Sequence, residues 1–198
     1  MVISPQPKRR PGGRSAHVRA TVFAATLDEL HVQGYEAMSI ARIAAQAGVH
    51  ETSIYRRWRT KAVLAVDALS TYAEQALPIP DTGALHTDLT ALLREVVQFL
   101  HSPEGAAMAQ IAVTTGDDRE FAQLRSAFWK GRFTLLDAIA ARAVARGELS
   151  PQVDARLLIE TVIGPIYVRA LFTRESLDDA MIERIVTLVL GGVNGALA

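Results

Sequence analysis

The stretch that decides the fold is residues 39–61, SIARIAAQAGVHETSIYRRWRTK. It predicts two short helices joined by a tight turn at Gly48, because glycine adopts the positive φ that such a turn needs. Ser39 can cap the first helix by accepting a hydrogen bond from its free N–H groups. The small Ala44 lets two steeply crossing helices approach closely. These features are typical of a helix-turn-helix, whose second helix enters the major groove of DNA.

Apolar and polar residues in this stretch occupy the positions that a DNA-reading motif requires. Four apolar residues are spaced to form a small core beneath the turn: Ile40, Ile43, Val49 and Ile54. The second helix presents side chains suited to phosphates and base edges, namely Thr52, Ser53, Tyr55, Arg56 and Arg57. An ordinary pair of core helices can also contain such a turn. Because the small residue, the glycine and the apolar positions all fall in register, the pattern favours DNA binding.

Residues from about 17 to 69 resemble the N-terminal domain of the tetracycline-repressor (TetR) family. The positions that carry the resemblance are Gly34-Tyr35, Ser39-Ile40, Ile43-Ala44, Ala47-Gly48-Val49, Ile54-Tyr55-Arg56, Trp58 and Lys61. The remainder resembles the family's regulatory domain more loosely, best over residues 164–172, GPIYVRALF. Trp58 and Arg59 stand where the family usually has Phe and Pro. Trp58 is still a large aromatic anchor, so the fold argument is unaffected.

The resemblance implies an all-α protein with an N-terminal three-helix DNA-binding domain and a helical ligand-binding and dimerisation domain. It also implies a ligand-responsive transcriptional regulator, usually a repressor, that a small and largely apolar effector releases from a palindromic operator. We divide the chain into a disordered basic arm (1–14), the helix-turn-helix domain (15–60), a connecting helix (61–77) and the helical body (78–198). The expected partners are double-stranded operator DNA, a small-molecule effector and a second copy of the chain.

The motif residues are expected to divide their roles on DNA. Three should contact phosphates: Ser39, Tyr55 and Lys61. Four should approach base edges: His50, Thr52, Ser53 and Arg56. Glu51 fits this surface less well, because phosphates repel an anion unless it accepts from a cytosine amine. It can instead cap the helix or restrain a nearby arginine.

Charge is unevenly distributed although the formal net charge is zero. Residues 1–61 hold ten Lys or Arg against four acidic residues, whereas the remainder holds eleven against seventeen. A basic head on an acidic body suits a protein that binds a polyanion with one end, although charge can also differ by chance. The arm, MVISPQPKRRPGGR, has no apolar period. It can reach into a minor groove or add only nonspecific attraction.

The rest of the chain shows helical patterns alone. Apolar periodicity, caps and breakers predict helices over residues 15–33, 61–77, 85–101, 103–115, 118–146, 154–173 and 176–190. Gly34 should end the first of these, and Pro165 should kink the helix over 154–173. The last helix is apolar nearly all round, which predicts burial on more than one side. With the helix before it, it is expected to form a four-helix dimer interface.

Catalytic motifs are missing from the sequence. The five histidines lack HExxH spacing, cysteine is absent, and neither a GxSxG elbow nor a phosphate-binding glycine loop occurs. We therefore expect no catalytic residue, no metal site and no cofactor. No apolar run is long enough for a membrane span, and the N-terminus lacks a signal-peptide pattern. A cytoplasmic protein without a membrane partner is the expectation.

An effector is expected to bind among the helices of residues 85–172. Aromatic and sulfur-bearing side chains there can line an apolar cavity: Phe99, Met108, Phe128, Trp129, Phe133 and Tyr167. Such residues also fill ordinary cores. A solidly packed body would favour a constitutive or architectural DNA-binding protein whose body only dimerises. A helical enzyme or a carrier of hydrophobic molecules would need the basic head to be incidental.

Overall fold

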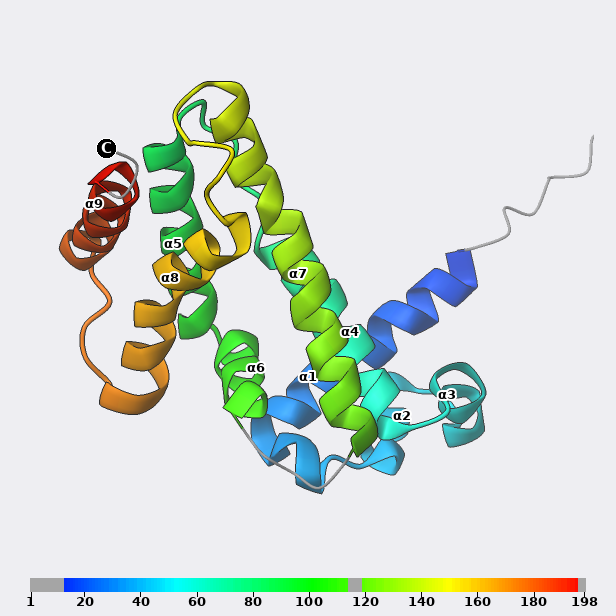
Figure 1. Ribbon diagram of the computed structural model, residues 1–198. Coiled ribbons are helices and arrows are strands. Elements are labelled where there is room, and N and C mark those ends of the chain that lie inside the picture. The colour runs from blue at the N-terminus through cyan, green and yellow to red at the C-terminus, as the bar shows by residue number, and fades with distance from the viewer. Residues whose placement is uncertain (1–12, 114–118, 196–198) are drawn as a thin grey trace, which may run out of the picture.

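The computed structural model describes residues 13–113 and 119–195, and every regular element in them is a helix (Figure 1). The elements in order are α1 (Gly13–Ala37), α2 (Ile40–Ala47), α3 (Glu51–Trp58), α4 (Lys61–Ala76), α5 (Leu85–His101), α6 (Pro103–Val113), α7 (Arg119–Ala145), α8 (Ala155–Val168), a π-helical turn (Arg169–Thr173) and α9 (Asp179–Gly195). The expected all-α class is confirmed. Most of the predicted basic arm, residues 1–12, lies outside the described residues.

The head, made of α1 to α3, forms as its local sequence predicts. Ser39 caps α2 by accepting a hydrogen bond from a backbone N–H of the first turn at 3.4 Å. Gly48 ends α2 with a φ of 67°. Ile43 and Ile54 are buried beneath the turn. Gly34 interrupts α1 with a φ of 73°, at the position where a helix end was expected.

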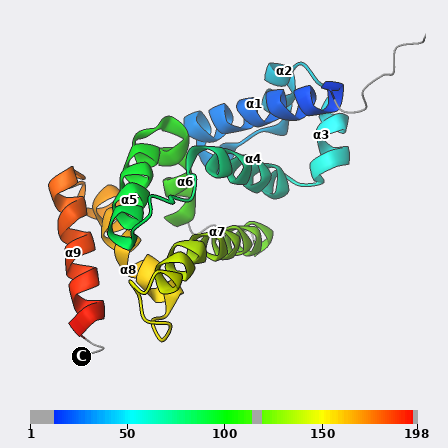
Figure 2. The ribbon, with the colours of Figure 1, turned by 90° about the horizontal axis from the view of Figure 1, so that it is seen from above.

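α4 connects the head to the rest of the molecule. Thr60 caps it by accepting from the backbone N–H of Val63 at 3.2 Å. Figure 2 shows α4 between α1 on one side and α7 on the other, and it packs against both. The buried side chains of α4 are mostly small, which allows this close packing: Ala62, Leu64, Ala65, Ala68, Leu69 and Ala73. α4 therefore belongs to the cores of both the head and the body.

The body consists of α5 to α9. Its longest helix, α7, extends from the far end of the body to the head and packs on α4, α5 and α8 (Figure 1). The side chains at the centre of the body are almost completely buried: Leu89, Leu92, Leu93, Ile139, Ile159, Val162 and Ile166. Tyr35 of α1 stacks on Phe121 of α7 with ring centroids 4.0 Å apart. The head and the body thus meet at this ring pair as well as through α4.

The segment around Pro165 differs from the expected single helix to Thr173. The α-helix runs through Pro165 and ends at Val168, and a π-helical turn follows it. This turn closes at Arg174, whose φ is 57°. The regular α-helix therefore ends five residues before the expected boundary at Thr173.

α9 packs on α5 and α8 through one side only. The buried side is formed by Met181, Ile182, Ile185 and Val186. Leu188, about two helical turns after Met181 and at the edge of the same side, is nevertheless 77% exposed. A single chain therefore covers only part of the apolar surface of α9. Among the described residues, no helix is both long and apolar enough to cross a membrane.

Candidate nucleic-acid interface

α3 is anchored by one side and open on the other. Ile54 and Trp58 are 1% and 4% exposed, respectively. Thr52, Tyr55 and Arg56 are exposed, and the Tyr55 ring lies in solvent although it is aromatic. A helix held from beneath, with a polar and cationic outer side, has the geometry needed to enter a major groove.

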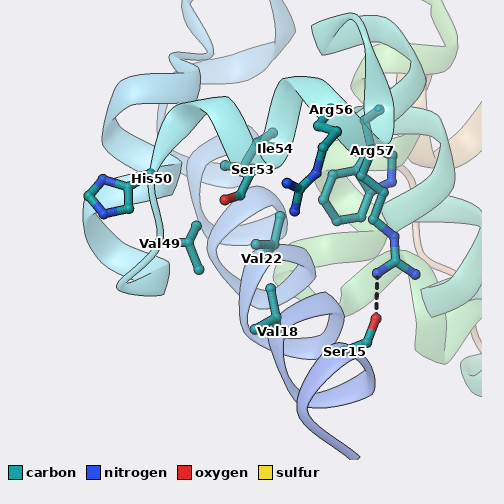
Figure 3. Close-up of a pocket in the computed structure, with 10 residues that line it drawn as sticks. Ser15, Val18, Val22, Val49, His50, Ser53, Ile54, Arg56 and Arg57 are labelled. Carbon is teal, nitrogen blue, oxygen red and sulfur yellow. Dashed lines mark hydrogen bonds between the residues drawn. The ribbon is translucent and has the colours of Figure 1, made fainter. Parts of the chain in front are cut away.

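An open groove separates α3 from the first turns of α1 (Figure 3). Three of the residues expected at base edges line this groove: His50, Ser53 and Arg56. Arg57 reaches from α3 toward α1 and donates to the Ser15 hydroxyl at 3.3 Å (Figure 3). Its guanidinium also lies 5.2 Å from the centre of the Trp58 ring. The groove is therefore bordered by cationic groups, which suits it to phosphates.

The residues expected at phosphates have different surroundings. The Ser39 hydroxyl already accepts a hydrogen bond as the cap of α2, whereas Tyr55 is exposed. Lys61 donates from Nζ to the Glu36 carbonyl at 2.9 Å, and Nζ lies 4.6 Å from the centroid of the Tyr35 ring. An ammonium has three N–H donors, so this carbonyl leaves two for a phosphate.

Glu29 fixes the start of α2 to α1, a role that the sequence pattern did not indicate. Its Oε1 accepts from the Ser39 backbone N–H at 3.0 Å and from Arg42 Nε at 2.8 Å. The hydrogen bond from Arg42 holds the pKa of Glu29 below its ordinary value. Burial raises this pKa in part, and the hydrogen bond from the Ser39 N–H lowers it further. Arg42 also donates to the Ala37 carbonyl at 2.7 Å. The turn before the motif is therefore held by a charged pair.

Asp67 of α4 joins three helices. One carboxylate oxygen accepts from Trp58 Nε1 at 2.8 Å, and the other accepts from Arg19 Nη2 at 3.1 Å. Trp58 thus makes a hydrogen bond that phenylalanine, the usual residue of the resembled family, cannot make. The contact links α3 directly to the helix that enters the body.

Glu51 lies exposed in the first turn of α3. An acidic side chain is favourable there because of the positive end of the helix dipole. No ion pair involving Glu51 occurs in residues 13–113 and 119–195, so restraint of an arginine is not observed there.

A small cavity lies among α5, α6, α7 and α8 in the body. Five of the six residues expected around an effector line it: Met108, Phe128, Trp129, Phe133 and Tyr167. Phe99 does not line it. Its ring instead faces Tyr72 of α4, with centroids 5.7 Å apart, and the ring edge lies next to Gly105 of α6. α5 thus directs Phe99 toward α4 and α6, away from the cavity.

This cavity is nearly closed. Its volume is about 20 Å³, enough for a single water molecule. A second space, a surface groove of about 300 Å³, lies next to the cavity. Four side chains line both the cavity and the groove: Trp129, Phe133, Ile163 and Tyr167. Arg132 also lines the cavity and is 8% exposed. Within the described part of the chain, no group of His, Asp and Glu side chains is arranged to hold a metal ion.

Two protein-family models match the chain. Residues 22–68 match the model described as bacterial regulatory proteins, tetR family. Residues 79–189 match the model of the tetracyclin repressor-like C-terminal domain. The first match ends within α4 and the second begins just after it, so the matches separate the head from the body.

Individual relatives agree with these models. The HTH-type transcriptional regulator AqdR of Rhodococcus erythropolis is 33% identical, covering 90% of this chain and 86% of the relative. The DNA-binding transcriptional repressor TetR of Mycobacteroides abscessus is 35% identical, covering 86% and 90%. The crystal structure of the TetR family transcription regulator SCO0332 superposes with a TM-score of 0.75 at 30% identity, covering 89% of this chain and 98% of that structure. The chain therefore belongs to the TetR family of helix-turn-helix transcriptional regulators.

Proposed function

We propose that this protein is a ligand-responsive repressor that binds a palindromic operator as a homodimer and is released by a small, largely apolar effector. The observation that carries DNA binding is the open side of α3, where Thr52, Tyr55 and Arg56 are exposed above the anchors Ile54 and Trp58. The relative from M. abscessus is named a repressor, which supports this direction of regulation.

On the operator, phosphate contacts and base contacts have different consequences. Lys61→Ala should weaken binding about equally on all sequences and lower the salt dependence by about one counterion. Tyr55→Ala should likewise weaken binding whatever the sequence. Thr52→Ala or Ser53→Ala should instead relax the preference at one position per half-site, at a cost of about 1–3 kcal/mol.

Selection of bound duplexes from a random pool tests DNA recognition. Affinity for the selected duplex is then measured by fluorescence anisotropy at several salt concentrations. Arg94→Ala is the matched control, because Arg94 is an exposed cation of the body whose partners are the acidic residues Asp179 and Glu183. The assignment is wrong if Tyr55→Ala and Lys61→Ala bind as tightly as the parent and Arg94→Ala at moderate salt.

Dimerisation is proposed to use α8 and α9. Four large apolar side chains are exposed from the start of α8 to α9: Leu157, Val168, Phe172 and Leu188. α9 lies at the end of the molecule opposite α3 in both views (Figures 1 and 2). A two-fold pairing of α8 and α9 would bury these side chains. It would present two reading helices to major grooves roughly 34–36 Å apart, or a small multiple of that distance.

Light scattering at micromolar concentration measures this association. The double variant Leu157→Glu/Leu188→Glu should be monomeric and bind the operator weakly, because two charges would be buried in the interface. Leu135→Glu is the control, since Leu135 is an exposed apolar residue of α7, 49% exposed. A monomeric parent refutes the dimer, and a chain truncated after Arg174 that still dimerises refutes this interface.

The effector is proposed to enter the body at the cavity beside Trp129. A space of about 20 Å³ holds no effector, so the ligand-bound body must be wider than this one. The groove of about 300 Å³ behind Trp129 and Tyr167 provides a route, since displacing these rings would join the two spaces. The ligand must favour the wider conformation, because equal affinity for both would shift nothing.

The closed cavity also favours a second candidate, a constitutive DNA-binding protein whose body only dimerises. A screen of small hydrophobic compounds separates the two candidates. A ligand-responsive repressor should yield a compound that raises the melting temperature and also releases the selected duplex. If none does both while DNA binding is intact, the constitutive function replaces the ligand-responsive one.

A further inference from the structure

Arg132 places a positive charge inside an apolar part of the body. It is 8% exposed and lines the same cavity as Leu92, Phe128 and Trp129. Burial lowers the pKa of its guanidinium, which nearby charges only partly oppose. Charged groups are seldom buried without a partner, because desolvation is costly.

The partners of Arg132 do not neutralise it. Its one hydrogen bond among the described residues runs from Nη2 to the backbone carbonyl of Leu77. Two carboxylates, those of Glu95 and Glu74, act on it only electrostatically, and neither forms an ion pair with it in the described structure. Glu95 is itself poorly satisfied: its Oε2 is buried without a hydrogen bond, and burial raises the pKa of this carboxyl. The guanidinium therefore has capacity for a stronger acceptor.

The other polar groups around the cavity are also hydrogen-bond donors. Within the described residues, neither the indole N–H of Trp129 nor the hydroxyl of Tyr167 forms a hydrogen bond. Burial raises the pKa of Tyr167 to about 12, so its hydroxyl stays protonated and can donate at neutral pH. A cation and two donors match an anionic group rich in acceptors. The remaining lining is apolar: Leu77, Leu92, Val96, Met108, Phe128, Phe133, Leu136 and Ile163.

We propose that the effector is an amphipathic carboxylate whose head group binds Arg132 and whose apolar part lies among the surrounding rings and aliphatic side chains. This inference rests on the proposed ligand-responsive function and names the chemistry of its ligand. A guanidinium binds a carboxylate through two parallel charge-assisted hydrogen bonds. A neutral amide of the same shape offers no charge and only one acceptor oxygen, so it binds more weakly.

The same residue connects the ligand to the DNA-binding head. Leu77 is the residue that ends α4, and its carbonyl is held by Arg132. A carboxylate is a stronger acceptor than a backbone carbonyl, so a head group in the cavity draws the guanidinium away from Leu77. The C-terminal end of α4 is then free to move, while its other end abuts α3.

Arg142 provides a matched control for Arg132. It also lies on α7 and donates from Nη2 to a backbone carbonyl after α4, that of Pro80, and it forms an ion pair with Asp81. Unlike Arg132, it does not line the cavity. Arg132→Met and Arg142→Met thus each remove one arginine contact to the same connecting segment, but only the first removes the anion site. Arg132→Met should fold, because an apolar side chain of similar length replaces a buried charge.

Calorimetric titration and thermal shift are performed with a carboxylate series from hexanoate to dodecanoate, with phenylalkanoates, and with the corresponding primary amides. For the best carboxylate, the parent and Arg142→Met should bind at least about tenfold more tightly than they bind its amide. Arg132→Met should lose that preference, and Arg132→Lys should keep part of it. The carboxylate should release the selected duplex from the parent and not from Arg132→Met.

Three results would overturn the inference. These are absence of binding by every carboxylate, equal binding of acid and amide by the parent, and equal binding of the acid by the parent and Arg132→Met. If neutral compounds release DNA from the parent and from Arg132→Met alike, the ligand-responsive function stands and the role of Arg132 is wrong. If the parent binds no duplex from the random pool, the proposed function fails, whereas titration with the carboxylates still measures the Arg132 site.

Discussion

Trp58→Phe tests whether the hydrogen bond between α3 and α4 stabilises the head. The substitution keeps an aromatic ring against Phe23 but removes the donor to Asp67, which lies 2.8 Å away. A hydrogen bond to a charged acceptor contributes about 1.5–3 kcal/mol. The lower end applies here, because Asp67 is 38% exposed and keeps its contact with Arg19. The smaller buried ring removes about another 1 kcal/mol at roughly 25 cal/mol per Å².

The expected loss of unfolding free energy is therefore about 2–3 kcal/mol. Urea unfolding at one fixed protein concentration measures it, because the stability of an associating protein depends on concentration. A cycle of Trp58→Phe, Asp67→Ala and the double variant isolates the pair, with an expected coupling of about 1 kcal/mol. Arg19→Met is the control for the second oxygen of the same carboxylate. A coupling below about 0.3 kcal/mol would refute a stabilising Trp58–Asp67 bond.

Three further substitutions have defined outcomes. Glu29→Gln should lower stability by about 1 kcal/mol at neutral pH. Because the pKa of Glu29 is lowered from 4.5, the stability advantage of the parent should be complete above pH 4.5 and be lost as the pH falls through the lowered pKa. Melting temperatures of parent and variant across pH measure this. Arg59→Gly should stabilise by about 1 kcal/mol, since Arg59 holds a φ of 53° that glycine adopts without strain; an unchanged or lower denaturation midpoint would contradict this. Gly105→Ala should destabilise by about 2 kcal/mol or more, because its Cβ would overlap the Phe99 carbonyl, whereas Gly131→Ala on the open surface of α7 should not.

The head could be predicted from sequence because its determinants are local. Ser39 caps the helix that follows it, and Gly48 and Gly34 adopt the positive φ for which glycine is suited. Ile43 and Ile54 are buried as their spacing requires. Each of these features depends on a few neighbouring residues, so the pattern in residues 34–61 was sufficient.

The contacts that organise the site around these helices are not local. Glu29 meets Arg42 across the head, Asp67 meets Arg19 from another helix, and Arg132 reaches a carbonyl 55 residues away. A charged residue in a sequence is ordinarily read as solvated surface, and nothing in its neighbours indicates a distant partner. Phe99 illustrates the same limit for apolar residues, since it was expected to line the effector cavity but its ring faces Tyr72 of α4.

α4 is the element through which a change in the body can reach the DNA-binding surface. Asp67 in its first half bonds Trp58 of α3, and the Leu77 carbonyl at its end accepts from Arg132. At 1.5 Å per residue these positions lie about 15 Å apart along the helix. Buried alanines let α4 pack closely against its neighbours, so we expect a displacement at Leu77 to be transmitted along the helix. The Trp58–Asp67 bond would make α3 follow, so under the proposed ligand response DNA and ligand would prefer different positions of α4, as regulation by differential affinity requires.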